Sequence, residues 1–572
     1  MVNLNINAVK SHTFDAIVVG SGITGGWAAK ELTEKGLNVL MLERGRDVKH
    51  IEDYKTAMTD IWDFQHRNKL SRETLEKYTT AARGNAYAVQ EPSSYLFESD
   101  TDQPYIEKKP FDWVRGYQTG GKSLMWGRHS YRWNKEDFEA NAKDGHGVDW
   151  PIRYEDLDSW YTYVEKFVGI SGLKEGYDAL PDGDFLKPMP FLQPEQYFRE
   201  QVKSKFGRLV TIGRTANLTE AKECHTAVGR TACQYRSLCI RGCPFGGYFS
   251  TQSATLPAAM QTKRLTLVND AIVTEIIYDE KFNKAKGVRV MNQHTNEVTE
   301  YFAKIIFMNA GTIPTASILL NSKSNRFQNG FGNDSDQVGR NLMDHNGGAG
   351  AMATIEGFED DYYYGRRPTG LYVPRFRNWG NDKQEYLRGF GYQGGASRGN
   401  WNRGINKDGF GADFKDSLGT PGDWGMMLIG IGEMLPNEKN RMYHDNDKKD
   451  KWGMPLVTFD VERGENEQLM RKAMSQDMAE MYEAVGFKNI RPFDFPSNPG
   501  MGIHEMGTAR MGKDPKTSVL NKNNQVHDCK NVFITDGSAM ASSSCVNPSL
   551  TYMALTARAA DFAVNELKKK NL

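Results

Sequence analysis

The stretch Asp15-Ala-Ile-Val-Val-Gly20-Ser-Gly22-Ile-Thr-Gly25 begins with an apolar, β-branched run and continues into a glycine-rich turn. Such a run is typical of a buried parallel strand. The turn fits the pattern G-x-G-x-x-G, in which Gly20 allows the tight turn, Gly22 lets a pyrophosphate approach the backbone and Gly25 lets helix and strand pack closely. A helix expected from about Trp27 to Lys35 would direct free N–H groups at the phosphates.

A second strand, expected over Asn38–Glu43, completes a βαβ unit. Glu43 ends this strand 18 residues after Gly25, where an acid accepts hydrogen bonds from ribose hydroxyls. This context of strand, turn, helix and acid predicts a bound dinucleotide rather than a merely structural turn. It does not separate FAD from NAD.

Strand-like runs near both ends of the chain predict a discontinuous nucleotide-binding domain, formed by residues 1–346 together with 499–572. Residues 347–498 are rich in Gly, Asn, Asp and aromatic residues, and they predict an inserted, β-sheet-rich substrate-binding domain. The expected fold class is therefore α/β. The elements expected are strands at Leu265–Asn269, Lys304–Asn309, Trp424–Ile431, Leu456–Val461 and Asn531–Thr535, and a helix from about Ser549 to Lys568.

The composition excludes several classes of protein. Lys and Arg total 72, as do Asp and Glu, so the formal net charge is zero and nothing suggests a nucleic-acid partner. No apolar run approaches the roughly 20 residues needed to span a bilayer. Residues 1–10 lack the apolar core of a signal peptide, so we expect no export signal in this chain.

Aromatic residues of 347–498 could stack on sugar rings, although scattered aromatic residues usually belong to a core. Gln393 and Trp401, with the Gly-rich loops around them, are candidates for substrate contact only. The aromatic residues concerned are Tyr362, Tyr363, Tyr364, Tyr372, Trp379, Tyr392, Trp401 and Trp424.

Three of the six cysteines, Cys233, Cys239 and Cys243, lie within eleven positions, in the segment 224–250. Such crowding predicts ligands rather than disulfides, and three thiolates indicate an iron–sulfur cluster. Zinc usually takes four ligands, often in C-x2-C pairs, so a zinc site or a set of buried thiols is the weaker alternative. Cys224 leaves a question open, because as a fourth ligand it would permit four irons. We expect Cys529 and Cys545 to be buried thiols, and His225 to lie at the surface.

Further motifs follow the N-terminal turn in an order that covers essentially the whole chain. They are Gly120-Gly-Lys-Ser-Leu-Met-Trp-Gly127, Trp150-Pro-Ile-Arg-Tyr-Glu-Asp-Leu157, Asn309-Ala-Gly-Thr-Ile-Pro314, His504-Glu-Met-Gly-Thr-Ala-Arg-Met-Gly512, Thr535-Asp-Gly-Ser538 and Asn547-Pro-Ser-Leu-Thr551. In these residues the chain resembles the glucose–methanol–choline (GMC) oxidoreductases. The resemblance implies FAD as cofactor, held in a Rossmann-like domain of the GMC and p-hydroxybenzoate hydroxylase type.

The resemblance also implies the catalytic pair. His504 matches the family's catalytic histidine, and a neutral histidine is suited to take the hydroxyl proton. Asn547 matches the second member, which would hydrogen-bond the substrate oxygen while hydride passes to flavin N5. The alternatives are a loop histidine and an asparagine that caps the helix near Pro548. Besides Gly20, Gly22, Gly25 and Glu43, the FAD contacts implied are Gly120, Gly121, Ser123, Trp126, Asp536, Asn547, Pro548 and Thr551.

Within the family, the chain resembles pyranose 2-oxidase and the flavoprotein subunits of bacterial sugar dehydrogenases. In those dehydrogenases the spacing C-x5-C-x3-C-P, here from Cys233 to Pro244, holds a [3Fe–4S] cluster. Pyranose 2-oxidase attaches FAD through a histidine, and Met125 stands at that position here. The resemblance therefore implies FAD that is not covalently linked.

The sequence thus predicts an FAD-dependent dehydrogenase that oxidises a sugar or glycoside hydroxyl, with C3 of a glucoside as the favoured position by analogy. Electrons would leave through the cluster, and the resemblance implies a small accessory subunit and a cytochrome c as partners. An oxidase that makes peroxide, or a flavin-binding electron carrier without catalysis, are the alternatives. Location is expected to be periplasmic, by export together with a partner subunit, or cytoplasmic.

Overall fold

The N-terminal βαβ unit forms as predicted in the computed structural model, which describes residues 13–83, 89–361, 367–400, 403–404, 408–495 and 497–572. Strand β1 (Thr13–Val19) pairs in parallel with β2 (Val39–Leu42), and α1 (Ile23–Glu34) connects them. The helix begins four residues before the predicted start. Gly25 and Gly26 favour a loop by propensity but lie in its first turn, because a Cβ on Gly25 would meet the backbone of Gly20 and one on Gly26 would meet Thr251 and Thr255.

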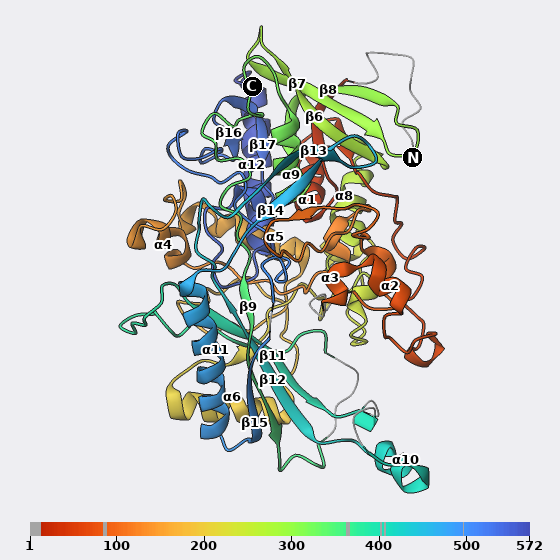
Figure 1. Cartoon of the computed structure of the whole chain (residues 1–572), viewed down its shortest axis with the longest axis vertical. Coiled ribbons are helices and arrows are strands. Elements are labelled where there is room, and N and C mark those ends of the chain that lie inside the picture. Colours follow the sequence, from red (N-terminus) through yellow and green to blue (C-terminus); the bar gives the residue numbers. More distant parts are fainter. Residues whose placement is uncertain (1–12, 84–88, 362–366, 401–402, 405–407, 496) are drawn as a thin grey trace.

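The largest sheet has eight strands and contains the elements predicted near both ends of the chain (Figure 1). Its parallel part has the order β17-β8-β1-β2-β5, with β16 antiparallel at one edge and the antiparallel β6 and β7 extending from β8. A strand from the last fifty residues therefore belongs to the same sheet as β1 and β2, which lie within the first fifty. The bounds are β5 Leu265–Val268, β6 Ala271–Asp279, β7 Lys284–Asn292, β8 Val298–Met308, β16 Gln525–Val526 and β17 Cys529–Ile534.

Alternation along β1 explains how helices cover this sheet. Ala16 and Val18 pack with α1, α8 (Leu256–Gln261) and the C-terminal helix α12 (Ser549–Lys568). Ile17 and Val19 point to the opposite face, where the start of α9 (Thr312–Asn321) belongs to the same apolar cluster. Successive side chains of a strand point to opposite faces, so a sheet buried on both sides needs the continuous apolar run seen in the sequence.

A second, six-stranded antiparallel sheet occupies the lower half of Figure 1, in the order β15-β9-β12-β11-β10-β4. Helix α11 (Glu465–Ala484) packs on it through four fully buried methionines, at positions 470, 474, 478 and 481, which repeat at helical spacing. The strands are β4 Thr211–Ile212, β9 Asn346–Ile355, β10 Leu371–Val373, β11 Phe390–Arg398, β12 Trp424–Gly432 and β15 Lys488–Asp494. The predicted α/β fold with a sheet-rich second region is confirmed.

A third, small sheet joins the two regions of the chain. The predicted strand at 456–461 is observed as β14 (Pro455–Asp460), but it pairs with β13 (Arg441–Lys449) and β3 (Ile106–Glu107) rather than with the six-stranded sheet. Strand β4, conversely, enters the six-stranded sheet from outside 347–498. The domain boundaries stay a prediction.

The remaining elements are short helices and turns. They are α2 Arg72–Lys77, α3 Thr79–Ala82, α4 Lys135–Asp144, α5 Asp158–Val168, α6 Gln193–Phe206, α7 Glu223–Thr226, α10 Gly411–Gly419, η1 Ile61–Asp63, η2 Ser94–Leu96, η3 Gly121–Leu124, η4 Tyr154–Asp156, η5 Cys239–Arg241, η6 Thr251–Thr255 and η8 Gly537–Ala539. Among the described residues, no helix is both long enough and apolar enough to span a membrane.

Three of the four described aromatic residues considered for sugar stacking belong to the core, and Trp379 is half-buried. Tyr372, Tyr392 and Trp424 are buried, and Tyr372 stacks on Tyr131 with ring centroids 4.3 Å apart. Trp401 and Tyr362–Tyr364 lie outside the described residues.

Candidate active site

A cavity of about 310 Å³ opens at the carboxyl ends of the parallel strands. Val19 and Leu42, the last residues of β1 and β2, line it, as do Asn309 and Asp536, which follow β8 and β17. This is the edge at which open α/β sheets bind ligands. Ten residues named from the sequence line the cavity: Gly20, Gly22, Glu43, Gly121, Ser123, Met125, Trp126, His504, Asp536 and Asn547.

Four predicted cofactor residues do not line the cavity, and the structure gives each a supporting contact. A Cβ on Gly25 would lie 1.9 Å from the Gly20 carbonyl oxygen, so Gly25 permits helix and strand to pack. The Gly120 N–H donates to Ser21 Oγ at 2.8 Å. Thr551 Oγ1 is hydrogen-bonded to the Tyr161 hydroxyl at 2.8 Å, and Pro548 is the N-cap residue of α12.

The carboxylate of Glu43 is buried and already hydrogen-bonded by protein. Oε2 accepts from the N–H of Ser21 at 3.0 Å and from its hydroxyl at 2.5 Å, and Oε1 accepts from the Gly45 N–H at 2.8 Å. Burial raises the pKa of Glu43, while these bonds act against the increase. Each carboxylate oxygen accepts more than one bond, so Glu43 both fixes the glycine-rich turn and presents oxygen to the cavity wall.

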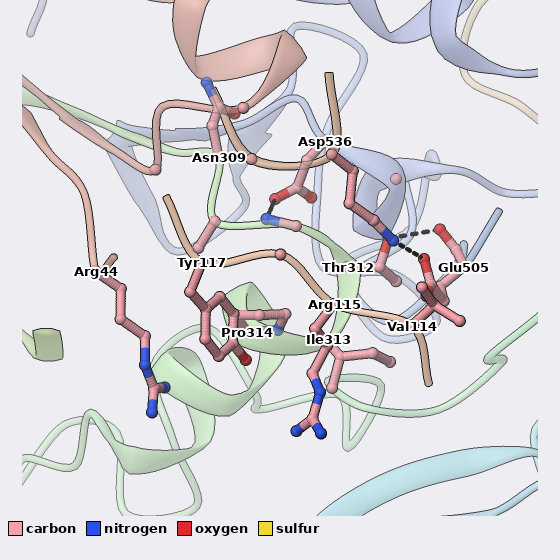
Figure 2. Close-up of a pocket in the computed structure, with 18 of the residues that line it drawn as sticks. Arg44, Val114, Arg115, Tyr117, Asn309, Thr312, Ile313, Pro314, Glu505 and Asp536 are labelled. Carbon is pink, nitrogen blue, oxygen red and sulfur yellow. Dashed lines mark hydrogen bonds and ion pairs between the residues drawn. The ribbon is translucent and has the colours of Figure 1, made fainter. Parts of the chain in front are cut away.

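The opposite wall carries polar groups on the segments that follow β8 and β17 (Figure 2). Asp536 accepts from the Gly311 N–H at 2.9 Å and from Thr315 Oγ1 at 2.6 Å. Glu505 forms an ion pair with Lys122 at 2.8 Å. Among the described residues, the amide nitrogen of Asn309 and Oε1 of Glu505 are buried without a hydrogen-bond partner.

His504 lies on this cavity with its ring held by a second histidine. Nδ1 of His504 is 2.7 Å from Nδ1 of His345, and the two rings meet edge to face. Its backbone N–H donates to Asp344 Oδ1 at 3.1 Å. Burial, followed by the nearby His345, Lys122 and His129, holds the pKa of His504 well below its usual value. The ring is therefore neutral near pH 7 and able to accept a proton.

Asn547 also lines the cavity, and it does not cap the helix that follows. Its Oδ1 accepts from Gln393 Nε2 at 2.5 Å, and no side chain caps α12 at Pro548. The capping alternative is thus wrong. Gln393 belongs to β11, so this bond joins the six-stranded sheet to the cavity. The amide hydrogens of Asn547 remain as donors, because its oxygen is the acceptor of this bond.

Sequence reasoning missed His345, Asp344 and the His129 side chain that also lines the cavity. His345 ends the run Asn341-Leu-Met-Asp-His345, just before the predicted domain boundary. The only local signal was an Asp-His pair after Leu342 and Met343, and nothing in the sequence placed it beside a residue 159 positions later.

The cysteine segment has a different character. Cys233, Cys239 and Cys243 are partly exposed free thiols, whereas Cys529 and Cys545 are buried, as predicted. Burial raises the pKa of Cys233 to about 11, and the neighbouring Cys239 and Cys243 add to the increase. No three His, Cys, Asp or Glu side chains among the described residues are gathered as a metal site. The three thiols are therefore neighbours that are not drawn together around one point.

Two buried basic residues border this segment. His225 is fully buried, with Nε2 donating to the Lys166 carbonyl oxygen at 3.0 Å, so its predicted surface position is wrong. Arg230 is also buried and donates to backbone carbonyls of Gly246 and Val168. Among the described residues its Nη2 makes no hydrogen bond, and the acidic groups that act on its pKa are the thiols of Cys224 and Cys243 rather than carboxylates. A buried guanidinium without a counter-charge is costly and favours an anionic group nearby.

A parallel sheet whose strand ends hold a glycine-rich phosphate turn, opposite a neutral histidine, defines a dinucleotide-dependent oxidoreductase. Comparison with protein families then identifies the family of oxidoreductases to which the chain belongs. Residues 14–347 match the N-terminal part, and residues 436–556 the C-terminal part, of the GMC oxidoreductases. The chain belongs to the GMC oxidoreductase family.

Relatives matched over nearly their full length include dehydrogenases and an oxidase, the paromamine 6'-oxidase of Streptomyces fradiae, which is 24% identical over 98% of this chain and 92% of the relative. The chain is 26% identical to the fructose dehydrogenase large subunit of Gluconobacter japonicus, over 97% of this chain and 98% of the relative. It is 25% identical to the gluconate 2-dehydrogenase flavoprotein of Pantoea cypripedii, over 97% and 94%. Among solved structures, an Aspergillus oryzae formate oxidase, studied for its FAD modification, superposes with a TM-score of 0.62 at 14% identity, covering 98% of this chain and 99% of that one. This last likeness shows the fold alone.

Proposed function

We propose that this chain is a sugar or glycoside dehydrogenase that binds FAD non-covalently in the cavity and oxidises a ring hydroxyl to a carbonyl. The observation that carries the proposal is the shared cavity, which brings His504 and Asn547 together with the glycine-rich turn. Two of the full-length relatives are named for fructose and gluconate. C3 of a glucoside is the first position to test.

The cavity residues fit a flavin dinucleotide. A Cβ on Gly22 would meet nothing within 4 Å, so this glycine faces open space at the start of α1. No side chain caps that helix, whose first N–H groups are free for phosphate oxygens. The unpartnered Asn309 amide supplies a donor on the same wall. Met125 offers no nitrogen for a covalent link.

The chain's own residues supply acid–base chemistry and orientation. Bound FAD would accept hydride at N5. Nε2 of His504 takes the proton from the substrate hydroxyl, because its ring is neutral and its Nδ1 is engaged by His345. The amide hydrogens of Asn547 hold the substrate oxygen, since Gln393 occupies the amide oxygen.

Cys233, Cys239 and Cys243 are proposed as the residues that would hold a [3Fe–4S] cluster, which would supply one-electron transfer when bound. Three features support this. The thiols are neighbours, the buried Arg230 needs an anion, and the cysteine turn η5 packs against η3, whose residues line the cavity. The buried Tyr248 hydroxyl also donates to the Leu124 carbonyl at 2.5 Å, linking the two segments.

An accessory subunit and a cytochrome c acceptor complete the proposal. The relative from Gluconobacter japonicus is named as a large subunit, which supports a multi-subunit assembly. A periplasmic location, reached together with such a partner, belongs to the same proposal, with the cytoplasm as the alternative.

The test is anaerobic mixing of the purified holoprotein with fructose, gluconate, glucose and methyl glucoside. We expect one of the sugars to bleach the oxidised flavin within seconds, and the product to carry a new carbonyl. Rapid reoxidation of the reduced flavin by air, with peroxide released, would instead make the enzyme an oxidase. Absence of bleaching with every sugar would leave an electron carrier.

A further inference from the structure

We propose that His345 is a positioning residue, which fixes the tautomer of His504 so that Nε2 carries the free lone pair. The inference rests on the proposed function in one respect, that His504 takes the substrate proton. It is carried by two distances around a buried imidazole, one to a backbone carbonyl and one to His504.

The first distance sets the tautomer of His345. Its Nε2 lies 3.1 Å from the carbonyl oxygen of Ser543. A carbonyl oxygen only accepts hydrogen bonds, so Nε2 of His345 must carry a hydrogen. A neutral imidazole has a single N–H, and the Nδ1 of His345 therefore has a lone pair.

The second distance passes this constraint to His504. The two Nδ1 atoms are 2.7 Å apart, within hydrogen-bond range. Because Nδ1 of His345 accepts, Nδ1 of His504 must donate. The hydrogen of a neutral His504 is then on Nδ1, and its lone pair is on Nε2, on the other side of the ring. His504 lines the cavity, so this is the nitrogen available to a substrate.

The alternative, a His345 cation that donates from both nitrogens, is opposed by its surroundings. His345 is only 2% exposed, and burial lowers its pKa. Asp344 and Glu433 are the acidic groups that act against this, but both have other partners: Glu433 pairs with Arg388 at 2.6 Å. On the His504 side, Lys122 and His129 disfavour any further positive charge. The neutral pair is therefore the stable form near pH 7.

Asp344 fixes the backbone of the same segment while His345 fixes the ring. Asp344 Oδ2 accepts from the N–H groups of Gly500 and Gly502 at 2.9 and 2.8 Å, and Oδ1 accepts from that of His504. Ser543, which anchors His345, precedes Asn547 by four residues. His345 thus connects the segment that carries His504 with the segment that carries Asn547.

The test compares two substitutions of His345 in the FAD-loaded protein, with the sugar that bleaches the flavin fastest. Phenylalanine removes the acceptor, and we expect His345→Phe to slow flavin reduction about 10²-fold while the apparent sugar Kd changes by less than about threefold. An asparagine amide oxygen can accept from Nδ1 of His504, so His345→Asn should recover about tenfold of that loss. His527, hydrogen-bonded to Ser518 away from the cavity, gives the control His527→Asn, expected within about twofold of wild type.

The outcomes separate this inference from the function on which it rests. Flavin reduction within about threefold of wild type in His345→Phe would overturn the positioning role, and so would equal losses in the Phe and Asn variants. If His504→Ala reduces its flavin as fast as wild type, the assignment of the base is wrong, and His345 has no base to position. Slow reduction in His504→Ala and His345→Phe, with recovery in His345→Asn, supports both.

Discussion

The cavity and the cysteine segment are built in opposite ways. In the cavity, both carboxylate oxygens of Glu43 and of Asp536 accept hydrogen bonds from protein, and His504 is held through both its backbone and its ring. In the cysteine segment, by contrast, the three thiols are partly exposed and are not gathered at one point.

The difference indicates how each centre is completed. The cavity is held in shape by protein–protein hydrogen bonds, so FAD can enter a site whose polar groups are already oriented. The cysteine segment is held by hydrogen bonds to backbone carbonyls, such as those from Arg236 to Ala57 and from Arg241 to Thr59, but these bonds do not gather its thiols at one point. Nη2 of the neighbouring Arg230 has no hydrogen-bond partner within the described residues. If the three cysteines bind iron as proposed, the segment would reach its final form only with the metal bound, because metal-binding energy then contributes to folding.

The largest effect is expected from removing the proposed base in the cavity. His504→Ala should slow flavin reduction by sugar by about 10²–10⁴-fold, because proton removal loses its acceptor. The amount of bound FAD should not change, since the other walls of the cavity stay intact. Anaerobic stopped-flow absorbance measures both. If sugar reduces the flavin of this variant at the wild-type rate, the base lies elsewhere, and His129, which also lines the cavity, would be the next residue to test.

Substitution in the cysteine segment should lower the iron content and leave flavin reduction by sugar nearly unchanged. Cys239→Ala should reduce bound iron from about three per FAD to less than about one, while sugar still bleaches the flavin at nearly the wild-type rate. Electron delivery to a one-electron acceptor should fall instead. Cys529→Ala is the matched control, a buried thiol outside the segment. Equal iron in the two variants would exclude Cys239 as a ligand.

Two glycines of the phosphate turn separate structural from binding roles. Gly25→Ala places a Cβ 1.9 Å from the backbone oxygen of Gly20 and should lower the free energy of unfolding by about 1–3 kcal/mol even without FAD. Gly22→Ala meets nothing within 4 Å, so it should leave the stability of the FAD-free protein unchanged and weaken FAD binding. Thermal unfolding with and without FAD tests this. The reverse pattern would contradict the assignment of Gly22 to the pyrophosphate.

The bond from the six-stranded sheet to Asn547 should have a moderate effect. Gln393→Leu removes the donor to Asn547 Oδ1, at a cost of about 1 kcal/mol, or about fivefold in kcat/KM. Gln384→Leu, whose amide donates to Asp382 away from the cavity, is the matched control. A loss of the same size in both variants would show that the contact to Asn547 has no special role.

The smallest effect is expected from mild acid. The pKa of His504 is held well below its usual value, and the deprotonated form is the active one. Flavin reduction should therefore persist as the pH falls through about 6.5, where an ordinary histidine would be half protonated, and decrease only at lower pH. A pH profile of the reduction rate with a midpoint at or above that value would contradict a buried, neutral His504.

Much of the fold could be predicted because its signals are local. The apolar run before Gly20 and the helix at 549–568 follow from periodicity and turn chemistry, and helix α12 has the predicted bounds. The partnership of β14 with β3 could not be predicted, since pairing across more than three hundred residues leaves no local pattern. For the same reason His345 was missed, while His504 and Asn547 were named only through family resemblance.

The central claim is that electrons enter at the cavity and leave through the cysteine segment. Iron and acid-labile sulfide per FAD, measured on protein purified without oxygen, test it most directly. The account predicts about three irons per FAD, held by the three cysteines of the segment. Protein that contains FAD and reacts with sugar but binds no iron would contradict it, and Cys233, Cys239 and Cys243 would then be structural residues of an oxidase-like enzyme.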